Sequence, residues 1–349
     1  MAAEWLKIGE ERPEEIIDKA STLLRRGKIV VLPTETVYGL AADRDNPQTI
    51  RRLYEIKERP LNKPFTLHIA DAKSFYYLAS PQKPYVYRLI EKFWPGPLTL
   101  IVEGKEGKKI GMRNPNFPLT RQIIRRSGVW VVMPSANLSG EAPAKEAEEV
   151  FSVFGNKVDL VVTASQPLKG ISSTIVDISA GNKIIRRGII AAAVEKEVKK
   201  RRVLFVCSGN TCRSVIAEYL LREYLNKRRP QLKDKVEVVS AGVFAIDNMP
   251  ASSLAIEVLK REGIDAALHR SRRLSPLLIK GSDLIIVMEE KHKDIVASLD
   301  KDIHLRLFHI NYFLKEKIDI YDPLGGGLEA YEEVYSLIKK AVENIGKKL

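Results

Sequence analysis

The chain has 349 residues, of which 45% are hydrophobic and 29% are charged, and its formal net charge is +13. This composition is typical of a globular protein of about two domains and excludes a disordered chain. No stretch approaches the roughly 20 apolar residues of a membrane-spanning helix, and two cysteines are too few for a disulfide scaffold. We expect a cytoplasmic protein, without a membrane partner, that binds an anion; the charge alone does not choose between a nucleotide, a phosphoprotein and a nucleic acid.

The first part of the chain alternates helical patterns with short apolar strands. A helix is predicted at 13–24, with proline in its first turn, and a buried strand at 28–32. Further strands are predicted at 65–69, 98–102, 129–133, 158–162 and 174–178, and further helices at 47–56, 85–93 and 144–154. The pattern predicts an α/β domain with a mixed sheet over residues 1–194.

Polar and cationic residues of this domain gather at strand ends and in loops: Lys57, Arg59, Lys63, Arg113, Ser135, Asn137 and Arg186. If the sheet brings them together, they form a positive cavity suited to a triphosphate. The sequence has no G-x-x-x-x-G-K-[ST] loop and no strand-bound G-x-G-x-x-G, so side chains would hold the nucleotide. Taken singly, each cation is better explained as a solvated surface charge.

Five motifs change this assessment: Pro33-Thr-Glu-Thr-Val-Tyr-Gly-Leu40, Lys57-x-Arg59, Trp94-Pro-Gly-Pro-Leu-Thr99, Arg113-x-Pro115 and Pro134-Ser-Ala-Asn-Leu-Ser-Gly140. With them, residues 12–190 resemble the YrdC family of threonylcarbamoyl-AMP synthases, which implies a YrdC-like mixed, twisted sheet. The implied reaction converts L-threonine, bicarbonate and ATP into threonylcarbamoyl-AMP and pyrophosphate, for N6-threonylcarbamoyladenosine in tRNA. Mg²⁺ would enter with ATP, and a downstream tRNA-modifying transferase is the implied partner.

Carried over residue by residue, the resemblance implies two groups of site residues. The ATP and phosphate contacts are Lys57, Arg59, Ser135, Asn137, Thr174 and Arg186, and the positions around threonine are Thr36, Tyr38, His68 and Arg113. His68 by itself could equally be a satisfied strand residue. The alternative function is a module that binds RNA without chemistry, and direct binding of tRNA stays open.

A charged run, residues 195–202, joins the two halves and is predicted to be a short solvated linker that is able to form a helix. A buried strand begins at Val203 and leads into the loop from Cys207 to Arg213, which an amphipathic helix follows. Backbone N–H groups at a helix N-terminus favour a bound anion. The loop is therefore predicted to be an anion site.

The side chains of this loop give the anion site a chemistry. The field that favours an anion also stabilises a thiolate, so the pKa of Cys207 should lie below the roughly 8.5 of a free thiol. Arg213 can bind two phosphate oxygens at once, and Asp322, beside Pro323, is the candidate general acid for the leaving group. This set predicts phosphoryl transfer to sulfur through a phosphocysteine, with no metal ligands.

Residues 203–349 resemble the low-molecular-weight protein phosphatases through Cys207-x5-Arg213-Ser214, Ser240-Ala-Gly242, His269-Arg-Ser271 and Asp322-Pro323. The resemblance implies a flavodoxin-like domain with a parallel sheet, no cofactor and a phosphorylated protein as substrate. It makes Cys207 the nucleophile, Arg213 the phosphate ligand and Asp322 the acid. Ser214 would hydrogen-bond the thiolate, and the loop residues Ser208, Gly209, Asn210, Thr211 and Cys212 would set shape and specificity. Val215 departs from the family, which often has proline there.

Two positions bear on the substrate. Thr211 resembles the threonine of bacterial protein-arginine phosphatases, and Leu324 with the following glycines stands where tyrosine-directed relatives place aromatic residues. We therefore favour phosphoarginine over phosphotyrosine. Cys212 is either a passenger or a partner for a reversible disulfide with Cys207. A loop that captures a phosphorylated partner without turnover is a further alternative, disfavoured by the presence of both Cys207 and Asp322.

Overall fold

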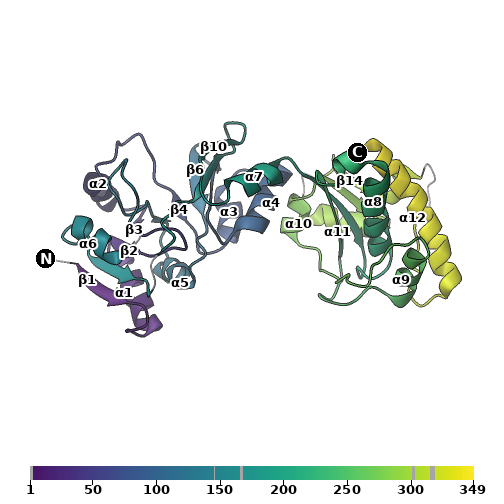
Figure 1. Ribbon diagram of the computed structural model, residues 1–349, viewed down its shortest axis with the longest axis horizontal. Helices are drawn as coiled ribbons and strands as arrows, with labels where there is room; N and C mark the ends of the chain where they lie inside the picture. The colour runs from purple at the N-terminus through teal and green to yellow at the C-terminus, as the bar shows by residue number, and fades with distance from the viewer. Residues whose placement is uncertain (1–2, 145, 166–167, 301–302, 315–318) are drawn as a thin grey trace. The chain divides into compact units, whose positions relative to one another are not determined.

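The computed structural model describes every residue except 1–2, 145, 166–167, 301–302 and 315–318 (Figure 1). The chain divides into two compact units. One comprises Met1–Gln82 and Leu89–Glu195, and the other comprises Lys83–Arg88 and Lys196–Leu349. Within the described residues, no helix combines the length and apolar character that crossing a membrane requires.

The first unit is built on a ten-stranded sheet in the order β1-β8-β2-β3-β7-β4-β6-β5-β9-β10. Strand β2 pairs in parallel with β8 and antiparallel with β3, so the mixed sheet predicted from the sequence is confirmed. The strands are β1 Glu4–Lys7, β2 Val30–Leu32, β3 Gly39–Asp43, β4 Leu67–His68, β5 Leu98–Glu103, β6 Lys109–Arg113, β7 Val131–Val132, β8 Leu160–Thr163, β9 Thr174–Asp177 and β10 Lys183–Arg186.

Two helices of the first unit share a hydrophobic core with the sheet. Ile16 and Leu24 of α1 (Pro13–Arg25) pack with Ile123 of α5 (Pro118–Ser127) and with Val30 and Leu160 of the strands. These side chains recur at helical spacing in α1, which explains why its pattern was readable from the sequence. The other helices before the second sheet are α2 Pro47–Ile56, α3 Lys73–Leu78, α4 Pro84–Phe93, α6 Ala147–Phe154 and α7 Ala191–Val198.

The charged run at 195–202 is helical as far as Val198, as the sequence allowed, but it is not solvated on all sides. Helix α7 begins four residues before the run, at Ala191, and strand β11 (Arg201–Cys207) begins two residues before Val203. Glu197 and Arg202 are buried, and the Arg202 Nε donates to Glu237 Oε2 at 2.9 Å. A charged side chain that finds a partner inside a fold can be buried, and composition does not reveal such a partner.

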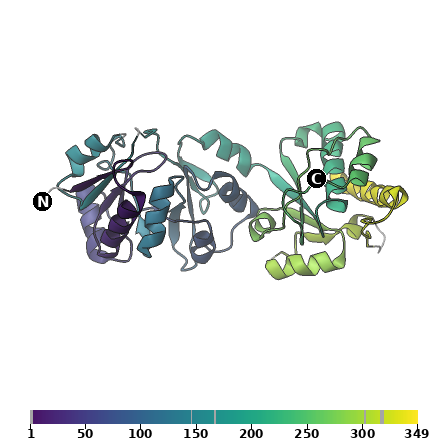
Figure 2. The same cartoon turned by 90° about the horizontal axis from the view of Figure 1, so that it is seen from below.

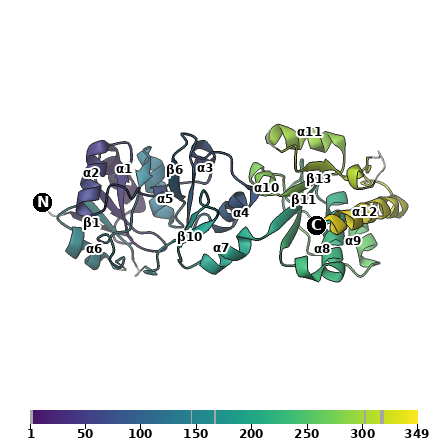
Figure 3. The same ribbon diagram turned by 90° about the horizontal axis from the view of Figure 1, so that it is seen from above.

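The second unit has a four-stranded, wholly parallel sheet in the order β12-β11-β13-β14. Helices α8, α9 and α12 cover one face, and α10 and α11 cover the other (Figure 3). Figure 2 gives the view from below, with α12 in yellow. The parallel-sheet prediction is confirmed. The elements are β12 Val236–Gly242, β13 Leu284–Val287, β14 Leu307–His309, α8 Arg213–Arg228, α9 Ser253–Lys260, α10 Pro276–Lys280, α11 Glu290–Leu299 and α12 Leu328–Lys348.

Strand β11 directs its side chains alternately to the two faces of this sheet. Val203, Phe205 and Cys207 belong to the core cluster under α8 and α12, whereas Leu204 and Val206 belong to the cluster under α10 and α11. Because Cys207 is the last residue of β11 and Arg213 is the first of α8, the loop between them curls over the carboxyl end of the sheet. Ligand sites of open parallel sheets lie at this edge.

Candidate active sites

A cavity of the first unit is lined by three guanidinium groups and by hydroxyl groups. Arg59, Arg113 and Arg186 line it together with His68. No carboxylate is among the described residues that line it, and no cluster of three potential metal-ligating His, Cys, Asp or Glu residues occurs in the described chain. The cavity is therefore suited to anions. Its hydroxyl groups come from Thr34, Tyr38, Thr66, Thr99, Ser135, Ser172 and Ser173.

A hydrogen-bond network fixes Arg113 at the floor of this cavity. Its Nη2 donates to Thr36 Oγ1 at 2.8 Å and to Glu35 Oε1 at 2.7 Å. Glu35 Oε2 accepts from the Asn116 backbone N–H at 3.0 Å, and Thr36 Oγ1 lies 2.9 Å from Thr34 Oγ1. The loop after β2 is thus tied to the end of β6. Sequence reasoning gave Glu35 no role, although it stands between the two threonines of the longest motif.

His68 and Tyr38 are both buried side chains that line the cavity. The His68 Nδ1 lies 3.2 Å from the Thr66 carbonyl oxygen, so Nδ1 carries the proton and donates to that carbonyl. Burial, with the nearby Arg113 charge, lowers the pKa of His68 to about 3. The imidazole is therefore neutral at pH 7, with Nε2 as an acceptor. The Tyr38 hydroxyl accepts from the Ala164 backbone N–H at 3.0 Å.

The neutral state of His68 predicts a pH dependence of stability. In the unfolded chain the imidazole has its ordinary pKa of 6.5, whereas in the folded chain the pKa is about 3. The stabilisation is therefore complete above pH 6.5 and is lost as the pH falls from 6.5 towards 3, by about 1.4 kcal/mol per pH unit. We expect a His68→Gln variant to show a flatter decline in the free energy of unfolding over this range. A variant at the exposed His304, changed likewise, should keep the wild-type slope; equal slopes in all three proteins would contradict the assignment.

The residues predicted to bind ATP divide into two groups. Arg59, Ser135 and Arg186 line the cavity, and Arg186 Nη2 donates to Ser173 Oγ at 2.9 Å. Lys57, Asn137 and Thr174 are not among the described lining residues. The Lys57 ammonium instead donates to the backbone carbonyls of Ser135 and Asn137, at 2.6 and 2.5 Å.

Lys57 therefore holds the Ser135–Asn137 loop against the end of α2. Burial, followed by the charge of Arg59, lowers the pKa of Lys57 to about 8. The Asn137 side-chain amide donates to the carbonyls of Leu138 and Glu141, and Thr174 Oγ1 accepts from the Ile190 N–H. In this arrangement Lys57, Asn137 and Thr174 shape the loops around the cavity. Their side chains would have to move to contact a ligand in it.

In the second unit, Asn210 sets the curvature of the cysteine loop. Its backbone is left-handed, with φ of 56°, a conformation that asparagine tolerates better than most residues. Its Nδ2 donates to Ser214 Oγ at 3.0 Å and to Ser240 Oγ at 2.7 Å. The loop also requires the glycine of Ser240-Ala-Gly242, because a Cβ at Gly242 would lie 2.6 Å from the Ser208 carbonyl oxygen.

The Cys207 sulfur lies inside this loop and is 2% exposed. It is 3.0 Å from Ser214 Oγ and accepts from the Asn210 backbone N–H at 3.3 Å. Burial raises the pKa of the thiol, and the hydrogen bond with Ser214 and the charge of Arg213 oppose that increase without overcoming it. The low thiol pKa expected from the sequence is therefore wrong for this arrangement. The main reason is the burial of the sulfur, which favours the neutral thiol over the thiolate.

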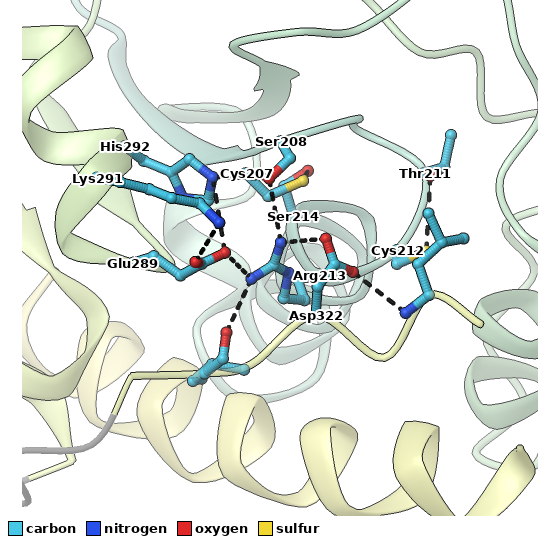
Figure 4. Close-up of polar contacts among 12 residues, drawn as sticks. Cys207, Ser208, Thr211, Cys212, Arg213, Ser214, Glu289, Lys291, His292 and Asp322 are labelled. Carbon is cyan, nitrogen blue, oxygen red and sulfur yellow. Dashed lines mark hydrogen bonds and ion pairs between the residues drawn. The ribbon is translucent and has the colours of Figure 1, made fainter. Parts of the chain in front are cut away.

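Arg213 is 1% exposed and is bound by two carboxylates (Figure 4). Its Nη1 pairs with Glu289 and donates to the Ile320 carbonyl oxygen at 2.9 Å, and its Nη2 pairs with Asp322. These two negative charges weaken the stabilisation that the guanidinium charge gives to a thiolate. The structure thus brings the predicted nucleophile, phosphate ligand and acid together. Sequence reasoning missed Glu289, whose signal was the cluster of charged residues directly after β13.

Because Glu289 pairs with Arg213, we expect the pKa of the Cys207 thiol to depend on the charge of Glu289. In a Glu289→Gln variant one carboxylate beside Arg213 becomes neutral, so the pKa of Cys207 should fall and iodoacetamide should alkylate it faster at pH 7. The pH dependence of the alkylation rate, followed by mass spectrometry at Cys207, measures the shift. Glu290→Gln is the matched control, because Glu290 pairs on the surface with Lys293 at 2.8 Å. An unchanged or raised thiol pKa in Glu289→Gln would contradict this account.

Thr211 and Cys212 lie on the far side of the loop. Both cysteines are free thiols, and the Cys212 Sγ lies 3.1 Å from the Tyr331 hydroxyl and 3.5 Å from Ser252 Oγ. Burial and the contact with Cys212 raise the pKa of Tyr331 to about 12. The Thr211 Oγ1 lies 3.6 Å from Cys212 Sγ, and the half-buried Thr211 side chain is accessible from outside the loop.

The parallel sheet of the second unit, with a cysteine, an arginine and a carboxylate around one strand-to-helix loop, defines the class of cysteine-dependent phosphatases. The first unit is a mixed α/β fold with an arginine-lined cavity. Residues 22–188 match the Sua5_yciO_yrdC family, which carries the description "Telomere recombination". Residues 202–349 match the family "Low molecular weight phosphotyrosine protein phosphatase".

Individual relatives agree with this division. The chain is 34% identical over 191 residues to the threonylcarbamoyl-AMP synthase of Bacillus subtilis strain 168, covering 51% of this chain and 55% of that protein. It is 31% identical over 195 residues to a Methanocaldococcus jannaschii protein that is assigned as a threonylcarbamoyl-AMP synthase, and the match covers 53% of this chain and 91% of that protein. It is 38% identical over 149 residues to the protein-arginine-phosphatase of Geobacillus stearothermophilus, and the match covers 42% of this chain and 95% of that protein. The chain thus spans about half the length of the Bacillus synthase.

A solved structure of a doubly substituted Pyrococcus abyssi Sua5 aligns with 82% of this chain and 99% of its own, at 21% identity and a TM-score of 0.53. At this identity the likeness concerns the fold alone. The chain belongs to the threonylcarbamoyl-AMP synthase family in its first half and to the low-molecular-weight protein phosphatase family in its second half.

Proposed function

We propose that the chain is a bifunctional enzyme, with an L-threonylcarbamoyladenylate synthase in the first unit and a protein phosphatase in the second. For the synthase, the supporting observation is the cavity that presents three arginines and no described carboxylate. For the phosphatase, the supporting observation is that Cys207 and Arg213 bound one loop and that Asp322 pairs with Arg213 there. Membership of the two families supports both halves of the proposal.

In the synthase reaction, the threonine carboxylate would bind Arg113, whose guanidinium is oriented by Thr36 and Glu35. The threonine amine attacks bicarbonate and forms a carbamate with loss of water, and a carbamate oxygen then attacks the α-phosphorus of ATP while pyrophosphate leaves. Arg59 and Arg186 would neutralise the phosphate charge. Since the described lining residues include no carboxylate, Mg²⁺ would be held mainly by ATP phosphate oxygens, and it supplies further charge neutralisation. The adenylate then requires a tRNA-modifying transferase as its consumer.

The synthase proposal is tested by pyrophosphate release from ATP with the full chain, with and without threonine and bicarbonate. We expect release only when both are present. Release that ignores threonine would reject this substrate. No release at all, together with RNA binding that weakens as salt is raised, would favour the RNA-binding module instead.

In the phosphatase reaction, the Cys207 thiolate attacks phosphorus and forms a phosphocysteine. The loop N–H groups and Arg213 stabilise the transferring phosphoryl group, and Asp322 donates the proton that the leaving group requires. Asp322, now a carboxylate, takes a proton from the water that attacks the phosphocysteine, which releases phosphate and restores the thiolate. Arg213 must part from at least one of its two carboxylates for phosphate to enter.

We favour phosphoarginine as the substrate. Thr211 presents a hydroxyl beside the loop, and the carboxylates of Glu289 and Asp322 keep 15% and 37% of their side chains exposed at its mouth. A negative, polar rim suits a cationic guanidinium better than a phenyl ring. The acid loop continues with Leu324, 68% exposed, and glycines instead of further aromatic side chains. The relative from Geobacillus, named a protein-arginine-phosphatase, supports the same substrate class.

Two peptides of identical sequence, one with phosphoarginine and one with phosphotyrosine, distinguish the substrates. We expect a higher kcat/KM for the phosphoarginine peptide, and a Thr211→Ile variant in which this preference shrinks or reverses. A wild-type preference for phosphotyrosine would replace our substrate with the alternative. Phosphate released only stoichiometrically with enzyme would indicate a sensor that captures phosphorylated partners.

A further inference from the structure

Beside the cysteine loop lies a pair of side chains that the mechanism above does not use. Ser208 directly follows Cys207, and its Oγ lies 2.9 Å from the Nε2 of His292, near the start of α11 (Figure 4). The same oxygen accepts from Arg213 Nη2 at 3.3 Å. His292 is fully buried. A buried imidazole that is hydrogen-bonded to a hydroxyl beside the nucleophile requires a chemical explanation.

The surroundings of His292 determine which of its nitrogens carries the proton. Burial lowers the pKa of His292 to about 4, so the ring is neutral at pH 7 and has a single N–H. Its Nδ1 is buried without a hydrogen-bond partner, whereas Nε2 faces Ser208 and lies 3.8 Å from Glu289 Oε1. A proton on Nδ1 would be a buried donor without an acceptor, which is costly. The proton is therefore on Nε2, and His292 donates to Ser208.

The hydroxyl of Ser208 consequently receives two hydrogen bonds, one from His292 and one from Arg213. A hydroxyl has two acceptor sites and one proton, so both acceptor sites are filled and the proton remains. Neither neighbour can accept this proton, and the described part of the chain gives the hydroxyl no third partner. Ser208 adjoins the nucleophile in the chain and its Oγ lies 3.3 Å from Arg213 Nη2, so its free O–H is available beside the residues that would hold the phosphoryl group.

We propose that Ser208 is a phosphate ligand of the cysteine loop, which donates its hydroxyl proton to a phosphoryl oxygen, and that His292 is the residue that positions it. The inference rests on the phosphatase function proposed above and adds a side-chain donor to the loop N–H groups and Arg213. Because His292 and Arg213 hold the oxygen before any ligand arrives, the donor is oriented in advance.

The first test measures binding of inorganic phosphate to the full chain by isothermal titration calorimetry, alongside kcat and KM for a phosphorylated peptide. We expect Ser208→Ala to weaken phosphate binding roughly tenfold to a hundredfold, the range for a hydrogen bond to a charged group. KM should rise with kcat little changed, because the contact exists in both the ground and transition states. Ser208→Thr keeps the hydroxyl and should bind phosphate nearly as the wild type does.

Two His292 variants test the positioning role. His292→Gln retains a neutral N–H donor and should preserve phosphate binding, whereas His292→Leu should weaken it. In a Ser208→Ala background, His292→Leu should cause no additional loss. If His292→Leu does not fold, the comparison of Ser208→Ala, Ser208→Thr and His292→Gln still decides the question.

The possible failures are distinguishable. Wild-type phosphate affinity in Ser208→Ala would overturn the inference, and a further loss on adding His292→Leu to Ser208→Ala would show that His292 does not act through Ser208. A wild-type chain that neither binds phosphate nor dephosphorylates any phosphopeptide would instead overturn the proposed phosphatase function.

Discussion

A Cys207→Ser variant is expected to lose phosphatase turnover by at least about a thousandfold, because a hydroxyl at that position is a far weaker nucleophile than a thiolate. The Cys207 sulfur is buried inside the loop with Ser214 and the Asn210 N–H as partners, and a serine fits the same space. The measurement is phosphate release from a phosphoarginine peptide under multiple turnover.

The same variant carries its own control. The synthase cavity belongs to the other unit, so threonine-dependent pyrophosphate release by Cys207→Ser should match that of the wild type. Turnover that survives in Cys207→Ser would eliminate the phosphocysteine mechanism. Loss of turnover in Cys212→Ser with full activity in Cys207→Ser would assign the nucleophile to the other thiol.

The second large effect is expected at Arg113. Removing its guanidinium in Arg113→Ala deletes the group that would bind the threonine carboxylate and leaves Glu35 without its buried partner. We expect kcat/KM for threonine in pyrophosphate release to fall about a hundredfold or more, since a charge-assisted pair of hydrogen bonds is lost. The apparent KM for ATP should change much less.

Arg125→Ala is the matched control for this prediction, because Arg125 is an exposed arginine in the last turn of α5. It should leave threonine-dependent pyrophosphate release unchanged. If Arg113→Ala weakened ATP and threonine equally, Arg113 would belong to the phosphate side of the cavity. The phosphatase activity of both variants reports whether the second unit is intact.

Strongly periodic segments made much of the fold predictable. Helix α2 has the predicted bounds, because its apolar face and Pro47 mark it clearly. Strands β4 and β7 are only two residues long and were predicted too long. Of the apolar residues that flank them, Ile69 and Met133 are buried and Phe65, Val129 and Trp130 are half-buried, but none of them continues the strand. Strand β3 was missed, because Gly39–Asp43 has neither alternation nor β-branched residues. Its strand character comes from pairing with β2 and β7.

Site residues were predictable where they lie together in one loop. They were less predictable where they contact residues that are far away in sequence. The Cys207 loop is local in sequence, so its members could be named together. The direction of the Cys207 pKa shift was predicted wrongly, because the burial of the sulfur, which raises the thiol pKa, is visible only in the folded chain. Lys57 was recognised by its motif, but its contacts with the backbone carbonyls of Ser135 and Asn137 are visible only in the folded chain.

The two carboxylates on Arg213 also bear on how the phosphatase distinguishes its substrate from its product. Any dianion that enters the loop must displace at least one of them, which weakens the affinity for free phosphate and for a phosphorylated residue alike. A phosphorylated polypeptide can recover this loss through contacts outside the loop, whereas free phosphate has no such contacts. When Glu289 and Asp322 return to Arg213 after hydrolysis, they compete with the product for the Arg213 guanidinium, and this competition favours release and limits product inhibition.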